Sequence, residues 1–380
     1  MKIIDGKKLE FLISKHTNEE LARNKIGCKE VIVHQKGKRV YAGVFGTNPV
    51  GAAAARAGMI YRAASMTKPV TSVAVLQLVD KKLLNLDDKI SKFFPKAKDL
   101  KVAVVEDGKI ISFLPLKREI TVENLLSHTS GIGCSPLTDI LGCKNNAMSL
   151  DEAIEDILSK PVYFEPDSAQ CYGTTEAFDI AAGIVEKASG IRFDEYLNEN
   201  IFKPLEMTNT TFCPTEKQWE NTVAMHNRTK DGKGENSACL EGCVFENYSA
   251  ERMPAGAGLV TTAEDYVKFA DMLCFFGKTR NNGRILSEKA AVLLSTPHYP
   301  ANFENWCEKW GLGVRVVTDV SYPHGLGVGC FGWSGAYGTH FWVDRENGIS
   351  VVMMKNSRYD GGAGNKSACQ LERDVCDSLK

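Results

Sequence analysis

The sequence predicts a mixed α/β (α+β) fold, and three observations support this class. The chain has 380 residues, more than one typical hydrophobic core holds, which favours two lobes or one large α/β unit. Strand-like runs next to turn residues lie near both ends of the chain. Between them, segments whose apolar residues recur at helical spacing predominate.

The first part of the chain predicts a helix, a hairpin and a loop. Residues 6–24 form a charged, amphipathic segment, which we expect to lie as a helix over a sheet. The strand-like runs 31–35 and 39–45 flank a hairpin signal in which Gly37 supplies the positive φ of a tight turn. Residues 47–59, rich in Ala and Gly, are predicted to be a loop.

Residues 61–80 are predicted to begin with a short polar segment and to continue as a helix. Pro69 fits best in the first helical turn, because it lacks the N–H that a later position requires, and it places the helix start close to Ser65. The buried stripe of this helix is expected to be Val70, Val73, Leu76 and Val79.

Ser65 and Lys68 are candidate catalytic residues, because residues three apart project from the same face of a helix. Free N–H groups at a helix N-terminus favour a developing oxyanion. A serine needs a neighbouring base to become a good nucleophile, and a buried lysine can take part in that activation. Ser-x-x-Lys alone is a weak signal, and the alternative is an N-cap serine with a solvated lysine.

The middle of the chain is predicted to be mainly helical. A helical-to-loop region at 89–101 precedes a second hairpin around Asp107 and Gly108. Thr121 begins a Thr-x-x-Asn opening that is typical of a short helix, ended by a glycine. Further helices are predicted at 150–159 and at 175–189, the second ended by Gly190.

The C-terminal third returns to strands. A Gly-rich run leads into a helix with Thr262 as its expected cap, and it is no phosphate loop because Gly-x-Gly-x-x-Gly is absent. The remaining predicted elements are a helix at 283–294, strands at 340–344 and 349–354 around a turn at 346–348, and a helix at 366–379 that packs on the sheet.

Several motifs together resemble one family. The run Ala64-Ser-Met-Thr-Lys-Pro-Val-Thr71 closely resembles the nucleophile segment of class C β-lactamases and family VIII carboxylesterases, and Ser-x-x-Lys also occurs in class A β-lactamases and penicillin-binding proteins. Tyr172-Gly-Thr174, in a turn before a helix, resembles the family's Tyr-x-Asn element, with threonine in place of asparagine. Trp333-Ser-Gly335 resembles the Trp-Gly-Gly of the esterases, which stands where lactamases carry Lys-Thr-Gly.

This resemblance covers about residues 31–354 and implies the β-lactamase/DD-peptidase-like fold. A mostly antiparallel sheet, flanked by helices, would be built from both chain ends. The α/β lobe with this sheet would comprise residues 1–95 and 255–380. The helix-rich lobe would comprise residues 96–254, with loops that line the mouth of an active site between the lobes.

The resemblance also implies roles for particular residues. Ser65 would attack an acyl carbonyl, Lys68 and Tyr172 would handle its proton, and the backbone N–H groups of Ser65 and Ala336 would hold the oxyanion. The expected substrate-binding residues are Thr174, in the turn after Tyr172, and Trp333, Ser334 and Gly335, on an edge strand that a carbonyl can approach. We interpret His128, within a further family-like segment, as structural.

The composition limits the classes of binding partner that can be expected. With a formal net charge of -1 the chain has no basic field for nucleic acid, so a small neutral or mixed partner is expected. The resemblance implies that this partner is a small-molecule ester or amide substrate, and the oligomeric state is left open. No run is long enough to span a bilayer and no signal-peptide core is evident, which predicts a cytoplasmic protein without membrane contact. The twelve cysteines are then expected to be reduced, and neither a metal site nor a cofactor is predicted.

The resulting hypothesis is a serine hydrolase that cleaves small carboxylic esters through an acyl-enzyme on Ser65. The alternatives are a β-lactamase or D-amino-acid peptidase, which Thr174 and Trp333 disfavour, an acyltransferase with an alcohol or amine acceptor, and a non-catalytic ligand or peptidoglycan sensor.

Overall fold

The computed structural model describes residues 1–23, 26–48, 53–141, 148–228, 234–237, 252–298, 307–357 and 361–380. The predicted loop at 47–59 and the loops expected to line the active-site mouth lie partly outside these ranges. Within the described ranges, no helix combines the length and the apolar character that crossing a membrane requires.

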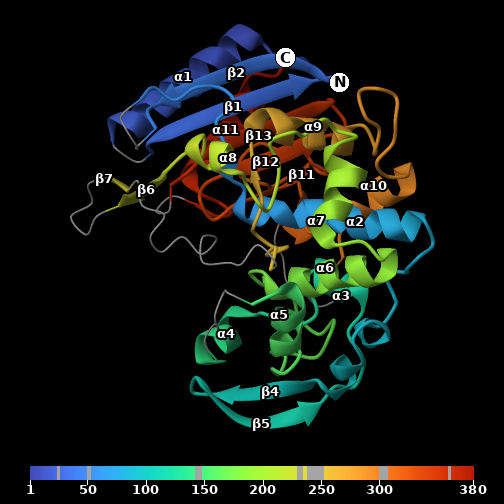
Figure 1. Ribbon diagram of the computed structural model, residues 1–380. Coiled ribbons are helices and arrows are strands. Elements are labelled where there is room, and N and C mark those ends of the chain that lie inside the picture. Colours follow the sequence, from blue (N-terminus) through green and yellow to red (C-terminus); the bar gives the residue numbers. More distant parts are fainter. Residues whose placement is uncertain are drawn as a thin grey trace.

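A seven-stranded antiparallel sheet forms one half of the molecule (Figure 1). Its strands, in spatial order, are β2 (Lys38–Gly46), β1 (Cys28–Gln35), β13 (Ile349–Lys355), β12 (His340–Asp344), β11 (Phe331–Ser334), β10 (Arg315–Val317) and β9 (Glu308–Trp310). Strand β1 pairs with β13 from Lys29↔Lys355 to Gln35↔Ile349, so strands from the two chain ends pair directly, one strand in from the β2 edge of the sheet. The predicted antiparallel sheet built from both ends is confirmed.

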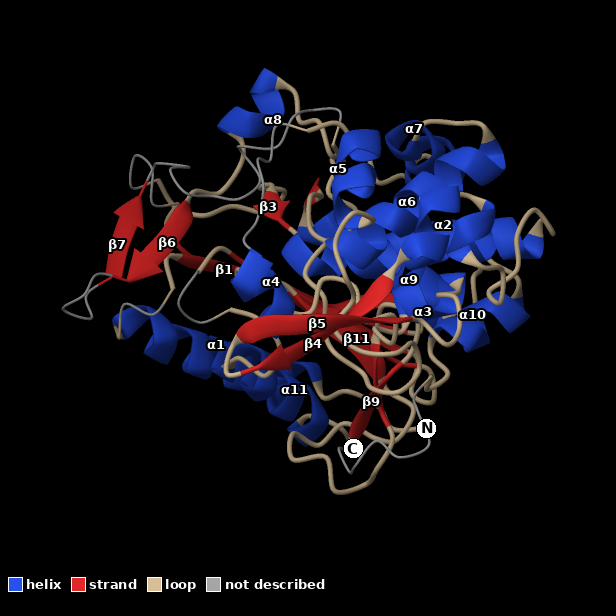
Figure 2. Ribbon diagram, turned by 90° about the horizontal axis from the view of Figure 1, so that it is seen from below, coloured by secondary structure: helices blue, strands red, loops and turns tan. Residues whose placement is uncertain are grey.

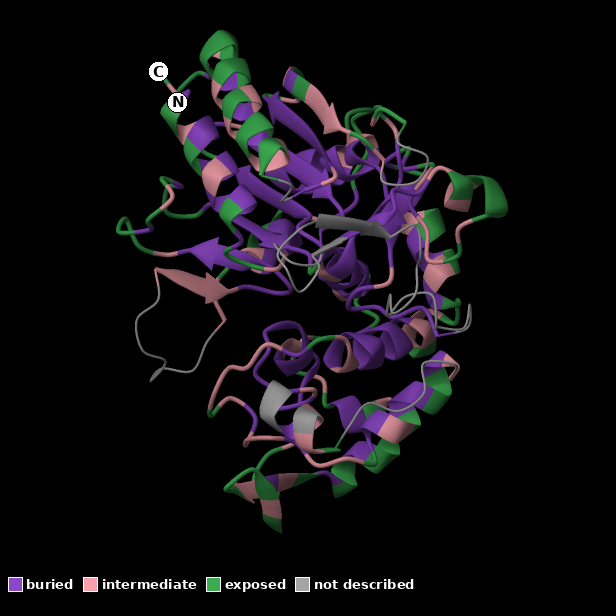
Figure 3. Ribbon diagram, turned by 90° about the vertical axis from the view of Figure 1, so that its left-hand side faces the viewer, coloured by how far each residue is buried: buried purple, intermediate pink, exposed green. Residues whose placement is uncertain are grey.

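Helices cover both faces of this sheet. Helices α1 (Gly6–Ala22) and α11 (Lys366–Asp377) pack on one face, where Leu9 and Leu371 join Trp342 in one buried cluster. Helix α9 (Ala263–Cys274) packs on the other face, against β1, β12 and β13. Strands β1, β12 and β13 are consequently buried along their whole length, as Figure 3 shows.

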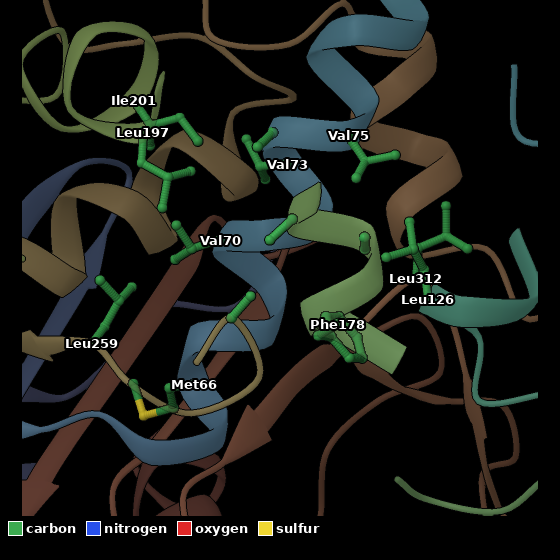
Figure 4. Close-up of a cluster of buried hydrophobic side chains, with 14 of the residues drawn as sticks. Met66, Val70, Val73, Val75, Leu126, Phe178, Leu197, Ile201, Leu259 and Leu312 are labelled. Carbon is green, nitrogen blue, oxygen red and sulfur yellow. The ribbon is translucent and has the colours of Figure 1, made fainter. Parts of the chain in front are cut away.

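The predicted stripe of the central helix α2 (Thr67–Asp80) is buried at Val70, Val73 and Leu76 and half-buried at Val79, but burial extends to every side of the helix from Thr67 to Leu78. The helix lies between other helices, with contacts to α6 (Glu176–Ser189) and to α10 (Glu288–Leu294). Figure 4 shows its side chains from Val70 to Val75 among side chains of neighbouring segments. Each fully buried valine or leucine stabilises the fold by roughly 1.5–3 kcal/mol.

The other half of the molecule is helix-rich and carries an outlying hairpin, β4 (Lys101–Glu106) with β5 (Lys109–Pro115), which lies beyond the helices in Figure 1 and faces the viewer in Figure 2. The remaining helices of the described chain are α3 (Val122–Leu126), α4 (Ser135–Leu141), α5 (Leu150–Ile157), α7 (Phe193–Leu197), the π-helical turn at Asn198–Phe202 and α8 (Glu216–Glu220). Short 3-10 turns lie at Ala64–Met66, Ile90–Lys92 and Pro95–Asp99. Two further antiparallel strand pairs are β3 (Tyr61–Arg62) with β8 (Val260–Thr261) and β6 (Met225–Arg228) with β7 (Gly234–Ser237). The division of the chain at residues 95/96 and 254/255 stays a prediction.

Most local predictions are confirmed, and three are corrected. Helix α3 ends at Leu126, before the glycine expected to end it. Helix α10 begins only at Glu288, because the Ser287 side chain accepts the amide N–H of Ala290 and caps it there. Strand β11 is not an edge strand, since it lies between β12 and β10, although β10 pairs with only its first two residues.

Candidate active site

Ser65 lies in a 3-10 turn that leads directly into α2. The preceding residue, Ala64, has φ of 48°, a left-handed conformation that is strained for a residue with a Cβ. Such strain is typical of functional sites and costs of order 1–3 kcal/mol. The sharp turn presents Ser65, which is partly exposed, at the start of an otherwise buried helix.

Three predicted catalytic side chains meet at the Ser65 hydroxyl. The Tyr172 hydroxyl donates a hydrogen bond to Ser65 Oγ at 2.6 Å. Lys68 Nζ lies 3.4 Å from the same oxygen. A nucleophile with two proton-handling groups at hydrogen-bonding distance can attack an acyl carbonyl and pass its proton on.

The Lys68 ammonium is fully buried and held by two backbone carbonyls in addition to Ser65. Nζ donates to Gly256 O at 3.0 Å and also to Thr174 O. It further lies 4.8 Å from the ring centroid of Tyr172 and 5.3 Å from that of Phe178. Because an ammonium has three N–H donors, the two carbonyls and Ser65 Oγ satisfy all of them.

Gly256 is a site residue that the sequence analysis missed. A Cβ at this position would lie 2.7 Å from Thr174 O and 3.3 Å from Lys68 Nζ, so only glycine fits against the lysine. The run Pro254-Ala-Gly-Ala-Gly258 was the available signal, because glycines allow the backbone to approach another group closely.

An aromatic wall supports Tyr172. Trp333 Nε1 donates to Tyr172 Oη at 3.3 Å, and the Trp310 ring stacks on Tyr172 with centroids 5.6 Å apart and planes at 17°. Trp310 and Trp333 contact each other edge-on, 4.4 Å between centroids. Trp310, on β9, belongs to no motif, and the sequence analysis missed it.

His128 packs against Tyr172, and its surroundings support the interpretation that His128 is a structural residue. Its ring packs against Tyr172 and Trp310, with centroids 4.8 Å and 4.3 Å away, and its Nδ1 accepts the amide N–H of Gly173 at 3.3 Å. Burial, helped by the Lys68 charge, holds the pKa of His128 well below its usual value. A neutral imidazole is therefore expected, with Nε2 carrying the proton.

The end of β11 is tied to the Ser65 turn. Thr339 Oγ1 donates to Ala63 O at 2.9 Å, and a Cβ on Gly335 would lie 2.1 Å from Thr339 Oγ1 and 2.4 Å from Ala63 O. Glycine is thus required for this close approach. Among the hydrogen bonds of the described residues, none uses the amide N–H of Ser65 or Ala336, the two predicted oxyanion donors.

Two predicted substrate contacts have different surroundings. The Ser334 side chain is buried and hydrogen-bonded to His340 Nδ1 at 2.9 Å, because alternation along β11 turns it to the face opposite Trp333. His340 Nε2 lies 3.2 Å from a Glu372 oxygen, so the Ser334 hydroxyl belongs to a buried polar group of the sheet, while substrate binding at Ser334 stays a prediction. Thr174 is exposed and donates its hydroxyl to Glu176 at 3.0 Å.

No metal is needed to describe this geometry. In the described part of the chain, no group of three or more His, Cys, Asp and Glu residues could hold a metal ion.

Comparisons with known proteins identify a family and relatives of this chain. A sequence model of the family described as Beta-lactamase matches residues 14–368. The acyltransferase calJ of Penicillium decumbens is 29% identical over 344 residues, which cover 82% of this chain and 79% of that protein. The esterase EstB of Burkholderia gladioli is 28% identical over 336 residues, which cover 81% and 80%.

Solved structures share the fold. The structure of EstCE1, described as a hydrolase with promiscuous acyltransferase activity, superposes with a TM-score of 0.82 at 21% identity, covering 98% of this chain and 99% of that one. The mixed α/β fold with a flanked antiparallel sheet is therefore the β-lactamase/DD-peptidase-like fold.

Proposed function

The chain belongs to the beta-lactamase family, and on this basis we propose that it is a serine hydrolase that cleaves small carboxylic esters through an acyl-enzyme on Ser65. One observation carries the proposal: Ser65 Oγ lies 2.6 Å from Tyr172 Oη and 3.4 Å from Lys68 Nζ. The similarity to esterase EstB supports the same reaction class.

In the proposed reaction Ser65 Oγ attacks the ester carbonyl. In the reactive form this pair carries one proton fewer than a Lys68 ammonium with a Tyr172 hydroxyl, so it accepts the Ser65 proton and then passes it to the leaving alkoxide. The amide N–H groups of Ser65 and Ala336 stabilise the tetrahedral oxyanion. Water then attacks the acyl-enzyme, and the same pair takes a proton from this water and passes it to Ser65 Oγ as the carboxylic acid leaves.

The motif Trp333-Ser-Gly335 favours uncharged substrates over β-lactams. A lactam carboxylate is best held by a cation, and this position carries Trp333, which offers apolar area and one N–H donor. That N–H already points to Tyr172 Oη. An acyl or aryl group without charge therefore suits this wall better than a carboxylate.

The test compares kcat/KM for a p-nitrophenyl ester and for a chromogenic cephalosporin, with Ser65→Ala as the blank. We expect faster turnover of the ester and an acyl adduct on Ser65 by mass spectrometry of the intact protein. Equal or greater efficiency on the cephalosporin would support the lactamase reading. An adduct on another residue would end the Ser65 assignment, and lack of labelling by a fluorophosphonate would favour a sensor.

An acyltransferase is the second candidate, favoured by the similarity to calJ. Hydrolysis and acyl transfer share the acyl-enzyme and differ only in the acceptor. Adding a primary alcohol or amine to the ester assay separates them. A transferase yields the new ester or amide in preference to the free acid, whereas a hydrolase yields mainly the free acid.

A further inference from the structure

Two cysteines lie beside Tyr172 and take no part in the proposed reaction. Cys134 is buried, and its Sγ lies 3.9 Å from the carbonyl oxygen of Cys171. Cys171 is partly exposed and directly precedes Tyr172. An isolated antiparallel bridge pairs Cys134 with Gly173, so residue 171 is diagonal to Cys134 across this short pairing.

The two thiols are also close to each other. The neighbouring Cys171 thiol, together with burial, raises the pKa of Cys134 above its usual value, and Cys171 is the larger cause. A hydrogen-bonding partner has this effect only at short range.

We propose that Cys134 and Cys171 are a modification site at which a small disulfide oxidant, such as glutathione disulfide, forms a disulfide next to Tyr172. The partly exposed Cys171 attacks one oxidant sulfur as its thiolate and releases one thiol, leaving a mixed disulfide. Cys134 then attacks the Cys171 sulfur, and its thiol proton passes to the departing thiolate, which leaves as the second thiol. One oxidant disulfide becomes two thiols, and the two protein thiols become one disulfide.

Closure of this disulfide moves the backbone. Diagonal neighbours across an antiparallel pair are about 7–8 Å apart, whereas disulfide-bonded Cα atoms lie about 4.4–6.8 Å apart. The bond therefore draws residue 171 toward Cys134. His128 fixes the reduced segment on both sides of Tyr172, through its carbonyl to the Cys171 amide at 3.0 Å and through Nδ1 to the Gly173 amide at 3.3 Å.

Displacement of this segment shifts the Tyr172 hydroxyl away from Ser65 Oγ, to which it now donates at 2.6 Å. Oxidation is therefore expected to lower esterase activity reversibly. This consequence rests on the proposed function, whereas formation of the disulfide does not.

Cys330 and Cys376 provide a matched control pair. Cys376 is close enough to contribute to the raised pKa of Cys330, after burial and Asp344. Both pack into the cluster under α11, on the sheet face away from α9. Their oxidation should leave Tyr172 undisturbed.

The experiment incubates the full-length protein with glutathione disulfide, blocks remaining thiols and maps the peptides. We expect a peptide pair linked through Cys134 and Cys171, and a glutathione adduct on Cys171 in the Cys134→Ala variant. Absence of the linked pair, at an oxidant concentration that does modify Cys171, would overturn the proposal. Peptide mapping does not depend on enzymatic activity, so it shows whether the disulfide forms even if the protein is not an esterase.

The second arm measures ester hydrolysis before and after oxidation, and again after dithiothreitol. The wild type should lose at least ~10-fold in kcat/KM, because a positioned general base contributes about 10²–10⁴-fold. The Cys330→Ala/Cys376→Ala variant should show the same loss, and Cys171→Ala should show none. A fully linked protein with unchanged activity would refute the coupling to Tyr172.

Discussion

At the scale of single residues, Lys68 Nζ has three hydrogen-bond acceptors: Ser65 Oγ and the carbonyl oxygens of Thr174 and Gly256. Burial of an ammonium costs several kcal/mol unless its donors are paired. The two carbonyls satisfy this requirement independently of substrate. The lysine therefore stays beside Ser65 in one geometry, with no need to reorganise when the serine is attacking.

Removing either proton-handling residue should reduce catalysis strongly. Tyr172→Phe and Lys68→Ala should each lower kcat/KM for a p-nitrophenyl ester by at least ~10²-fold, and the double variant little more, because residues that act as a unit are not additive. Tyr163→Phe, a nearby partly exposed tyrosine, is the matched control and should keep its activity. Thermal unfolding curves identify variants that lose structure. Near wild-type rates in Tyr172→Phe would show that this tyrosine only packs.

At the scale of elements, strand β9 brings Trp310 over the Tyr172 ring. Among the described residues the strand pairs with β10 alone, from Trp310↔Arg315 to Glu308↔Val317, and forms one edge of the sheet. Arg315 is fixed in turn by Glu372 on α11 at 2.8 Å. A buried ion pair between β10 and α11 thus helps to set the position of the strand that carries the aromatic wall.

We expect Trp310→Ala to loosen Tyr172. Aromatic pairs contribute about 0.5–1.5 kcal/mol beyond burial, which corresponds to a loss of roughly 2–12-fold, in kcat more than in KM for a small acetate ester. Trp310→Phe should recover most of the rate. Trp219, which lies over Arg62 away from Tyr172, supplies the control variant Trp219→Ala. A pure KM effect would instead assign Trp310 to substrate binding.

At the scale of the whole molecule, the central sheet buries a carboxyl group. Glu30 lies on β1, opposite Met354 of β13, and only 2% of it is exposed. Burial raises its pKa from 4.5 to about 7, although a backbone hydrogen bond from Gly58 opposes the shift. The folded protein therefore binds this proton more tightly than the unfolded chain does.

The sign of the resulting pH dependence follows by linkage. For an acid with a raised pKa, the stabilising effect of the proton is complete below pH 4.5 and is lost as the pH rises to about 7. The shift corresponds to about 3 kcal/mol. Glu30→Gln should remove this component, so the free energy of unfolding of the variant, relative to wild type, should increase between pH 4.5 and 7.

Urea unfolding at both pH values measures this difference. The exposed Glu10 provides a control, Glu10→Gln, which should follow the wild-type profile. If Glu30→Gln also follows the wild-type profile, the Glu30 carboxyl does not carry its proton at neutral pH.

Local signals predicted much of the fold and the centre of the site. The hairpin turn at Lys36 and Gly37 has φ of 53° and 70°, Gly190 ends α6 in the left-handed conformation, and Thr121 forms a capping box with Asn124. These features depend on neighbours in the sequence, so the sequence alone determined them. Ser65 and Lys68 were predictable for the same reason, because one helical turn fixes their spacing.

Tertiary contacts decided the rest. The side of β11 that faces Tyr172, and hence the burial of Ser334, follows from strand pairing between segments far apart in the chain. Trp310 and Gly256 belong to no catalytic motif, yet the sheet edge and the loop before β8 carry them to Tyr172 and Lys68. The sequence determined which groups could do the chemistry, because spacing and caps are local. Only long-range packing determined which carbonyls and rings surround these groups, because those distances depend on contacts between elements that are far apart in the sequence.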